Sequence, residues 1–167
     1  MSFKILYAMI AVLDTSAILS GKFYFSTADR VVTTPLVIKE FSEGGHSWRL
    51  MEYSRDAGME VIAPPESAIE KIRRAAMDTG DMENLSEADV EVLALAFHLK
   101  NSKLFTDDYS MQNVASHIGI ECEGILQEGI KKKFYWRYRC ASCGKFVEAG
   151  IKECPVCGGK IKRVRWK

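Results

Sequence analysis

The chain has 167 residues, of which 47% are hydrophobic and 27% charged, a composition that excludes a disordered polypeptide and leaves room for one ordinary domain with a small attachment. The formal net charge of +1 conceals two parts: residues 1–130 carry 11 Lys and Arg against 20 Asp and Glu, a net charge of −9, whereas residues 131–167 carry 12 against 2, a net charge of +10. We therefore expect an acidic body and a basic tail with different partners.

The first predicted element is a buried strand at Ile5–Leu13. This apolar run of nine residues is too short to cross a membrane. Because it follows Lys4, it resembles the apolar core of a signal peptide. A signal peptide would continue into a cleavage site of small residues, but Asp14 comes next, and this favours the strand. We accordingly expect a cytoplasmic protein with no membrane partner.

The rest of the body alternates helices and strands. Thr34 and Pro35 are typical of a helix start, as cap and first-turn residue. The further predicted elements are a helix over 47–58 that ends at a glycine, a strand over 59–64, helices at Ser67–Thr79 and Ser86–Lys100, a strand over 103–106, a helix over 107–119 and an edge strand over 120–125. This alternation predicts an α/β fold with a mostly parallel sheet and helices on both faces.

Acidic residues follow two of the predicted strands. Asp14 comes directly after the first strand, and Asp107 and Asp108 come after the strand over 103–106. Ligands of open α/β sheets bind at the carboxyl ends of the strands, so these side chains are candidates for a shared pocket. The alternative is structural, because Asp is also a common N-cap of the helix that follows.

Two more acids lie on predicted helices. Ser86 and Asp89 fit a capping box, and Glu40 fits an exposed helical acid, so each alone is explained without a site. Together with the strand-end acids they indicate more, because clustered carboxylates repel one another and need a cation to remain ionised together. Hard oxygen ligands of this kind suit Mg²⁺ or Mn²⁺.

The tail contains two Cys-x-x-Cys pairs, "CASC" and "CPVC", separated by ten residues. This spacing predicts one structural zinc ion held by four thiolates, Cys140, Cys143, Cys154 and Cys157. Two disulfides are the alternative, and they require an oxidising compartment for which no export signal is visible. Four cysteine ligands leave no open coordination position, so the zinc is not expected to be catalytic.

Basic residues alternate with aromatic residues on both sides of the cysteines. Alternation at period two predicts the strands of a zinc ribbon, with one face aromatic and the other cationic. The cations would meet phosphates, and exposed aromatic rings would stack on unpaired bases. The alternative is a solvated surface with the aromatic side chains as its small core. The candidate RNA contacts are Lys131, Lys132, Lys133, Arg137, Arg139, Lys160, Lys162, Arg163 and Arg165.

Four runs of the sequence, "VLDTSAIL", "TPLVIKEF", "LSEADVEVLALA" and "LFTDDYSMQNVA", resemble the signature blocks of the PIN-domain nucleases, and together they extend over residues 9–121. In that family each block supplies one acidic side chain, matched here by Asp14, Glu40, Asp89 and Asp107, with Asp108 as a neighbour of the last. The resemblance implies a small parallel sheet between helices and a catalytic site that holds Mg²⁺ or Mn²⁺.

The order of the parts is similar to one subgroup of the family. A PIN-like nuclease domain over 1–121, a linker over 122–133 and a zinc ribbon with a basic tail over 134–167 resemble the archaeal endonuclease that matures the 3′ end of small-subunit ribosomal RNA. The resemblance implies hydrolysis of a phosphodiester in precursor ribosomal RNA, leaving a 5′-phosphate and a 3′-hydroxyl.

Three alternatives stay open. A phosphatase of the haloacid-dehalogenase type also has a strand-end Asp, but it needs a second acid at the position of Ser16. A toxin-type PIN ribonuclease shares the acids and normally lacks the zinc module. A non-catalytic RNA-binding ribosome assembly factor shares the fold without turnover.

Overall fold

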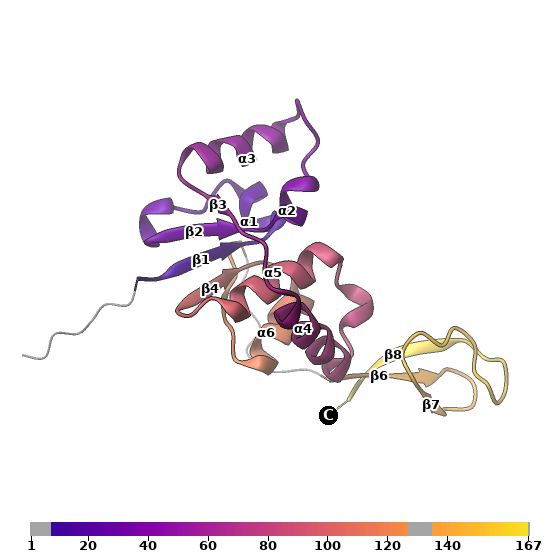
Figure 1. Cartoon of the computed structure of the whole chain (residues 1–167). Coiled ribbons are helices and arrows are strands. Elements are labelled where there is room, and N and C mark those ends of the chain that lie inside the picture. Colours follow the sequence, from indigo (N-terminus) through magenta and orange to yellow (C-terminus); the bar gives the residue numbers. More distant parts are fainter. Residues whose placement is uncertain (1–7, 127–134, 167) are drawn as a thin grey trace, which may run out of the picture.

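The computed structural model describes residues 8–126 and 135–166, which form a five-stranded parallel sheet and a three-stranded antiparallel sheet (Figure 1). The larger sheet has the strand order β3-β2-β1-β4-β5. Its strands are β1 (Ile10–Leu13), β2 (Arg30–Thr33), β3 (Glu60–Val61), β4 (Ser102–Phe105) and β5 (Glu121–Glu123). The α/β fold with a small parallel sheet is thereby confirmed.

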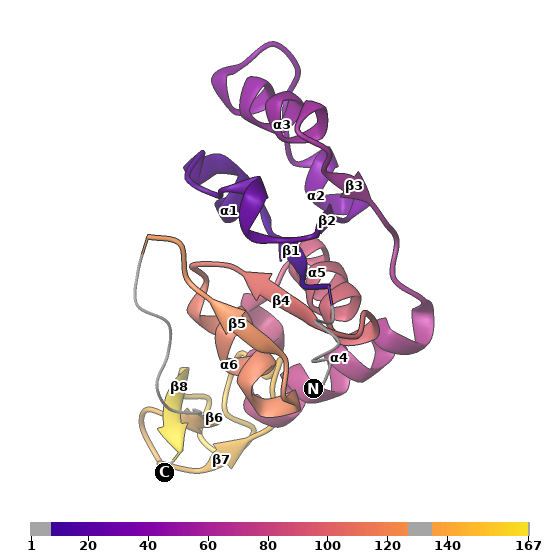
Figure 2. The same ribbon diagram turned by 90° about the vertical axis from the view of Figure 1, so that its left-hand side faces the viewer.

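Helices cover both faces of this sheet, so that β1 lies between α1 and α5 (Figure 2). The helices α1 and α3 pack against each other on one side, and α4, α5 and α6 pack together on the other. The helices are α1 (Thr15–Ser20), α2 (Pro35–Lys39), α3 (His46–Asp56), α4 (Glu66–Thr79), α5 (Glu87–His98) and α6 (Tyr109–Ile118), with two 3-10 turns, η1 (Phe25–Thr27) and η2 (Met82–Asn84).

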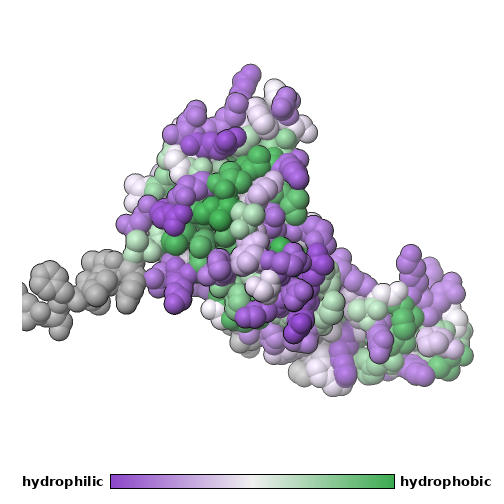
Figure 3. All heavy atoms as spheres, viewed as in Figure 1, coloured by the Kyte–Doolittle hydropathy of each residue, from purple (hydrophilic) through white to green (hydrophobic). Residues whose placement is uncertain are grey.

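The central strands are buried because helices cover them on both sides. Ala11, Val12 and Leu13 of β1 and Leu104 of β4 have no exposed surface. Apolar runs of this kind are typical of parallel strands. The space-filling view shows hydrophobic side chains gathered below α3 and a mainly hydrophilic surface over α4 (Figure 3). No helix within the described residues is both long and apolar enough to cross a membrane.

The strand order creates one special position in the sheet. The chain moves from β1 outward to β2 and β3, then returns to β4 on the other side of β1 and continues to β5. The carboxyl ends of β1 and β4 therefore meet where the direction of winding reverses, with Leu13 opposite Phe105. Ligands of open parallel sheets bind outside the strands at such a switch point.

The main differences between the predicted and the observed elements concern the strands. The first strand begins at Ile10, while residues 5–7 of the expected run lie outside the described residues. The strand expected over 59–64 has only two residues, Glu60–Val61. The strand β2 was not predicted, because its four residues include only two apolar side chains, Val31 and Val32. The strand β5 runs to Glu123, which places residues 122 and 123 of the expected linker in the sheet.

The smaller sheet has the order β7-β6-β8 and consists of β6 (Tyr135–Cys140), β7 (Phe146–Val147) and β8 (Ile161–Trp166). Along β6 the odd-numbered residues are exposed, and the even-numbered ones are half-buried or, at Cys140, buried. The predicted alternation of exposure is therefore present. The expected division into an aromatic and a cationic face is wrong, because the register sets Trp136 opposite Arg165 and Tyr138 opposite Arg163, so basic and aromatic side chains share a face. This sheet and the loops between its strands are called the ribbon below, and residues 8–126 the body.

Candidate active site and metal centre

Asp14 lies directly after β1, at the switch point of the sheet. The residue is only 4% exposed. Oδ1 accepts a hydrogen bond from the Ala17 N–H at 2.7 Å, which makes Asp14 the N-cap of α1, as the structural alternative predicted. Ser16 donates to both carboxylate oxygens at 2.8 and 2.9 Å, and the Thr106 hydroxyl donates to Oδ2. These donors fix the orientation of the carboxylate.

Burial dominates the electrostatics of Asp14 and raises its pKa to about 6, although the hydrogen bonds from Thr106, Ala17 and Ser16 act in the opposite direction. The negative charge of Asp89 raises it further. A buried carboxylate beside another acid is costly to ionise without a positive partner. A divalent cation would supply that partner, so the surroundings of Asp14 fit a metal ligand.

Asp89 stands in the first turn of α5 and closes the predicted capping box. The Ser86 N–H donates to Asp89 Oδ2 at 2.7 Å, and the Asp89 N–H donates to Ser86 Oγ at 3.1 Å. Burial is the main cause of a raised pKa at Asp89, and the negative charges of Asp108 and Glu40 add to it. Asp89 therefore interacts electrostatically with the acids of three other segments.

Glu40 follows the last residue of α2, and its side chain is exposed. Its carboxylate accepts a hydrogen bond from the hydroxyl of Thr15, the first residue of α1. Because Thr15 adjoins Asp14, this contact brings the end of α2 to the same edge of the sheet. Glu40 is thus positioned beside the switch point.

The neighbouring acids after β4 have different surroundings. The Asp107 carboxylate accepts hydrogen bonds from the Ile125 and Leu126 N–H groups, at 2.8 Å to Oδ1 from Ile125 and 3.1 Å to Oδ1 from Leu126, and so holds the segment after β5. The Asp108 carboxylate caps α6 through the Ser110 and Met111 N–H groups. Of these two acids, only Asp108 contributes to the raised pKa of Asp89.

The carboxylates lie around the switch point. Among the described residues, the only group of three or more potential ligands with atoms within 4.8 Å of one another is formed by cysteines. Each acid is held by its own hydrogen bonds from hydroxyl or backbone groups. Mg²⁺ keeps several water ligands and takes only one or two carboxylates directly, so a Mg²⁺ or Mn²⁺ site does not require three acids in contact.

Three hydroxyl groups that the sequence did not single out hold this arrangement together. Thr106 donates to Asp14 and accepts from the Asp108 N–H at 3.1 Å. Ser16 donates to Asp14 and accepts from the Asp107 N–H at 3.3 Å, while Thr15 donates to Glu40. The only signal in the sequence was their position next to acids, in "DTS" and "TDD".

A cavity of about 180 Å³ opens beside the same edge of the sheet. Its lining includes Lys22, Tyr24, Phe105 and Glu123. Tyr24 is 75% exposed, and Phe105 ends β4, one residue before Thr106. The cavity therefore combines a cation and aromatic side chains close to the acids, which is suitable for a nucleotide.

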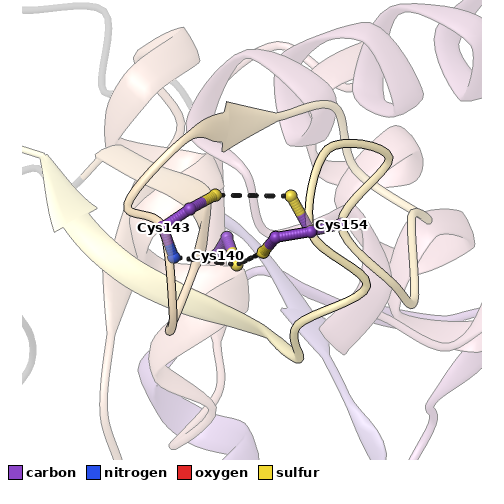
Figure 4. A group of neighbouring side chains, drawn as sticks. Cys140, Cys143 and Cys154 are labelled. Atoms are coloured by element: carbon purple, nitrogen blue, oxygen red, sulfur yellow. Dashed lines mark hydrogen bonds between the residues drawn. The ribbon is translucent and has the colours of Figure 1, made fainter.

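The four cysteines of the ribbon converge on one point (Figure 4). Sγ of Cys140 lies 3.4 Å from Sγ of Cys157, and Sγ of Cys143 lies 3.6 Å from Sγ of Cys154. All the thiols are free, which excludes the disulfide alternative for this structure. Tetrahedral zinc with bonds of about 2.3 Å separates its sulfur ligands by about 3.8 Å, so the sulfur atoms fit zinc.

Backbone N–H groups favour the thiolate form of Cys140, which is the form that binds a metal ion. The N–H groups of Ser142 and Cys143 point at Cys140 Sγ at 3.4 and 3.5 Å, and they lower the pKa of the Cys140 thiol. A Cβ atom at Gly159 would lie 2.9 Å from the same sulfur, so only glycine leaves the space. The predicted four-thiolate site is present. Cys122 lies apart from it in β5.

The candidate RNA contacts of the ribbon fall into three groups. Lys131, Lys132 and Lys133 lie outside the described residues. Arg163 is half-buried and paired with the body residue Asp81. The others are exposed on the ribbon surface: Arg137, Arg139, Lys160, Lys162 and Arg165.

The fold and the two sites define a class of protein: an α/β domain with acids at the switch point of a parallel sheet, joined to a four-thiolate ribbon. A family model described as the PIN domain of ribonuclease matches residues 11–99, just over half of the chain. The chain therefore belongs to the PIN-domain ribonucleases, as the four sequence blocks indicated.

Named relatives extend this match over most of the chain. It is 41% identical over 136 residues to the endoribonuclease Nob1 of Pyrococcus abyssi, covering 79% of this chain and 82% of that protein. It is 38% identical over 157 residues to the endoribonuclease Nob1 of Methanocaldococcus jannaschii, covering 92% and 77%. A protein named ribonuclease VapC1, from Thermoplasma acidophilum, is 36% identical over 161 residues, covering 93% and 78%.

Proposed function

We propose that this protein is a divalent-metal-dependent endoribonuclease that cleaves precursor ribosomal RNA at the 3′ end of the small-subunit RNA. The observation that carries the proposal is Asp14, a buried carboxylate at the switch point, within the electrostatic influence of Asp89. The names of the endoribonuclease relatives support the activity. The similarity of domain order to the archaeal processing enzyme supports the substrate.

The acids share one task in this proposal, which is to hold the metal. Asp14, Glu40, Asp89 and one or both of Asp107 and Asp108 would hold one or two Mg²⁺ or Mn²⁺ ions. Such ions lower the pKa of a bound water, polarise the scissile phosphate and neutralise the leaving oxygen.

The surrounding groups keep the carboxylates in place through the reaction. Thr106 and Ser16 hold the Asp14 carboxylate in one orientation. Asp107 fixes the backbone at 125–126, and Ile125 lines the cavity at Lys22 and Tyr24. A nucleotide next to the scissile phosphate would occupy this cavity, with its base against an aromatic ring and its phosphate near Lys22.

Binding of RNA is assigned mainly to the ribbon. The acidic body repels a polyanion, whereas the exposed cations of the ribbon attract one. With about six phosphate contacts, the logarithm of the affinity falls steeply with the logarithm of the salt concentration. Lys131, Lys132 and Lys133 remain predicted contacts.

The proposal is tested by incubating the zinc-loaded protein and an RNA fragment that spans the small-subunit 3′ boundary with Mn²⁺ or Mg²⁺. We expect one cut at the boundary, no cut without the divalent ion, and loss of cutting in Asp14→Asn. Asp78→Asn is the matched control, because Asp78 is an exposed acid of α4 away from the switch point. Cleavage by Asp14→Asn at the wild-type rate would refute the assignment.

A second candidate is a PIN ribonuclease with a different RNA substrate. It is favoured by the protein named ribonuclease VapC1, which matches 93% of this chain at 36% identity. The toxin-type enzyme considered above belongs to this group. Mapping the cut separates the two, because a boundary-specific enzyme leaves other single-stranded RNAs intact. The absence of any metal-dependent cut in wild-type protein would instead favour the non-catalytic assembly factor.

A further inference from the structure

The ribbon is seated on the turn that joins α4 to α5. In both ribbon views, β6 and β8 lie beside the end of α4 (Figures 1 and 2). Most of the contacting body residues are in the segment 80–84, which we call the docking turn. The ribbon residues that contact this turn are Trp136, Tyr138 and Arg163, which we call the inner face. Beside them, Tyr135 of β6 packs edge to face against His117 of α6.

A buried ion pair lies at the centre of this contact. Asp81 is 1% exposed, and its Oδ1 accepts a hydrogen bond from Arg163 Nη2. Its Oδ2 accepts from Asn113 Nδ2 of α6 at 2.6 Å. Since the Asp81 carboxylate is removed from water, it depends on these partners, and its charged partner comes from the ribbon.

The guanidinium of Arg163 is also enclosed on its other sides. It lies 4.3 Å from the centre of the Trp136 ring, within the range of a cation–π contact. The side-chain amide oxygen of Asn84, in the orientation that satisfies its hydrogen bonds, accepts from Nη1 and Nη2. A lysine ammonium cannot make this planar set of contacts.

The backbone of the docking turn approaches the ribbon closely at Gly80. This residue ends α4 in the left-handed conformation, with φ of 73°. A Cβ atom there would lie 2.4 Å from the Trp136 carbonyl oxygen and 2.9 Å from Trp136 Cβ. Glu83 of the docking turn accepts a hydrogen bond from Tyr138 of β6. Burial and this hydrogen bond raise the pKa of Tyr138 to about 12.

The opposite face of the ribbon presents different residues. In the antiparallel register Arg137 lies opposite Val164 and Arg139 opposite Lys162, so these residues share the outer face. The Arg137 guanidinium lies 4.4 Å from the centre of the Trp166 ring and 5.3 Å from that of Phe146. Each face of the ribbon thus carries both cations and aromatic rings: Arg163 and Trp136 meet the body, and Arg137 and Trp166 lie on the other face.

We propose that the inner face docks the ribbon on the body as a rigid arm, so that Arg163 is a positioning residue and the cut falls at a fixed distance from the RNA that the outer face holds. The fixed cutting distance rests on the proposed function, whereas the docking does not. The docking contact is connected to two acids of the candidate site. Asp89 lies in the helix that follows the docking turn, and Asn113, which binds Asp81, lies in the helix that Asp108 caps.

Docking is tested by ¹⁵N relaxation on the zinc-loaded full chain without RNA. We expect one rotational correlation time for the amides of the body and the ribbon. Gly80→Ala should give the ribbon its own, shorter correlation time, because the added methyl group collides with Trp136. Gly119→Ala is the matched control: Gly119 ends α6 with φ of 78°, and a Cβ atom there meets nothing within 4 Å.

A second variant separates positioning from RNA contact at Arg163. Arg163→Lys keeps the positive charge that a phosphate contact needs but loses the forked contacts to Asp81 and Asn84. We expect it to release the ribbon as Gly80→Ala does, whereas Arg137→Lys leaves it docked. Independent tumbling of the wild-type ribbon, or a docked ribbon in both Gly80→Ala and Arg163→Lys, would overturn the proposal.

The fixed distance is tested on the end-labelled boundary RNA. We expect a single cut for wild type and Gly119→Ala, and for Gly80→Ala cuts spread over neighbouring positions with about tenfold higher KM and unchanged kcat, because the tether alone then sets the effective concentration. A single cut by Gly80→Ala with a released ribbon would refute the arm. If the wild type makes no cut, the proposed function fails, and the relaxation data still decide the docking.

Discussion

At the scale of single residues, Asp14 carries the most information, because its burial opposes its charge. An acid whose pKa is raised to about 6 in the folded state favours folding while it is protonated, and that contribution is lost as the pH rises from about 4 through 6. Without a bound cation, ionisation of this buried carboxylate therefore lowers the free energy of unfolding at neutral pH.

The corresponding prediction concerns Asp14→Asn in buffer free of Mg²⁺ and Mn²⁺, with zinc retained. The difference in unfolding free energy between variant and wild type should shift in favour of the variant by about 2–3 kcal/mol between pH 4 and pH 8. Urea unfolding at a series of pH values measures it. A difference that does not change with pH would show that Asp14 ionises in the native state as easily as in the unfolded chain.

The site also shows at this scale what a sequence can and cannot reveal. Asp14 and Asp89 were candidates because they lie at a recognisable strand end and capping box, whereas Glu40 was a candidate only through the resemblance to the PIN-domain family. The roles of Thr106 and Ser16 were not predictable, since both depend on the register that sets β1 beside β4. The pairing of Arg163 with Asp81 spans 82 residues, and the alternation of the ribbon strands alone suggested an RNA contact there.

At the scale of elements, local signals predicted helix ends well and short strands poorly. Pro35 at the start of α2 and Gly119 at the end of α6 act through their own backbone conformation, which the sequence specifies directly. The strand β2 has four residues, and its identity comes from pairing with β1 and β3. Pairing of that kind is a property of the folded sheet.

The capping box of α5 gives a prediction at this scale. Ser86→Ala removes the hydroxyl that bonds the Asp89 N–H and carboxylate, and it should lower the unfolding free energy by about 1 kcal/mol. Asp89 keeps its bond to the residue 86 N–H, so cleavage should slow only a few-fold. Urea unfolding and single-turnover cleavage measure the two effects. Ser67→Ala, at an exposed position of α4, should change neither.

At the scale of the whole molecule, the two parts depend on different sources of stability. The body has a continuous core of buried apolar side chains on both faces of its sheet. The ribbon has two buried cysteines and little else, and a bound zinc ion contributes on the order of 10–16 kcal/mol to the folding of such a module.

Removal of zinc should therefore unfold the ribbon and leave the body folded. We expect chelation to collapse the amide resonances of β6–β8 while those of β1–β5 persist with local shifts at the docking turn. Two-dimensional NMR during a chelator titration measures this, and Cys140→Ser should reproduce it. Loss of the body resonances at the same chelator concentration would contradict this division.

Acids from separate segments are proposed to act as one cation-binding site at the switch point. Single-turnover cleavage of the boundary RNA with saturating Mn²⁺ tests this most directly, for the amide variant of each acid, with Asp78→Asn as control. We expect losses of about 100-fold or more for Asp14→Asn and Asp89→Asn, roughly 3 kcal/mol of activation free energy, and a wild-type rate for the control. Near-wild-type rates for both variants would contradict it.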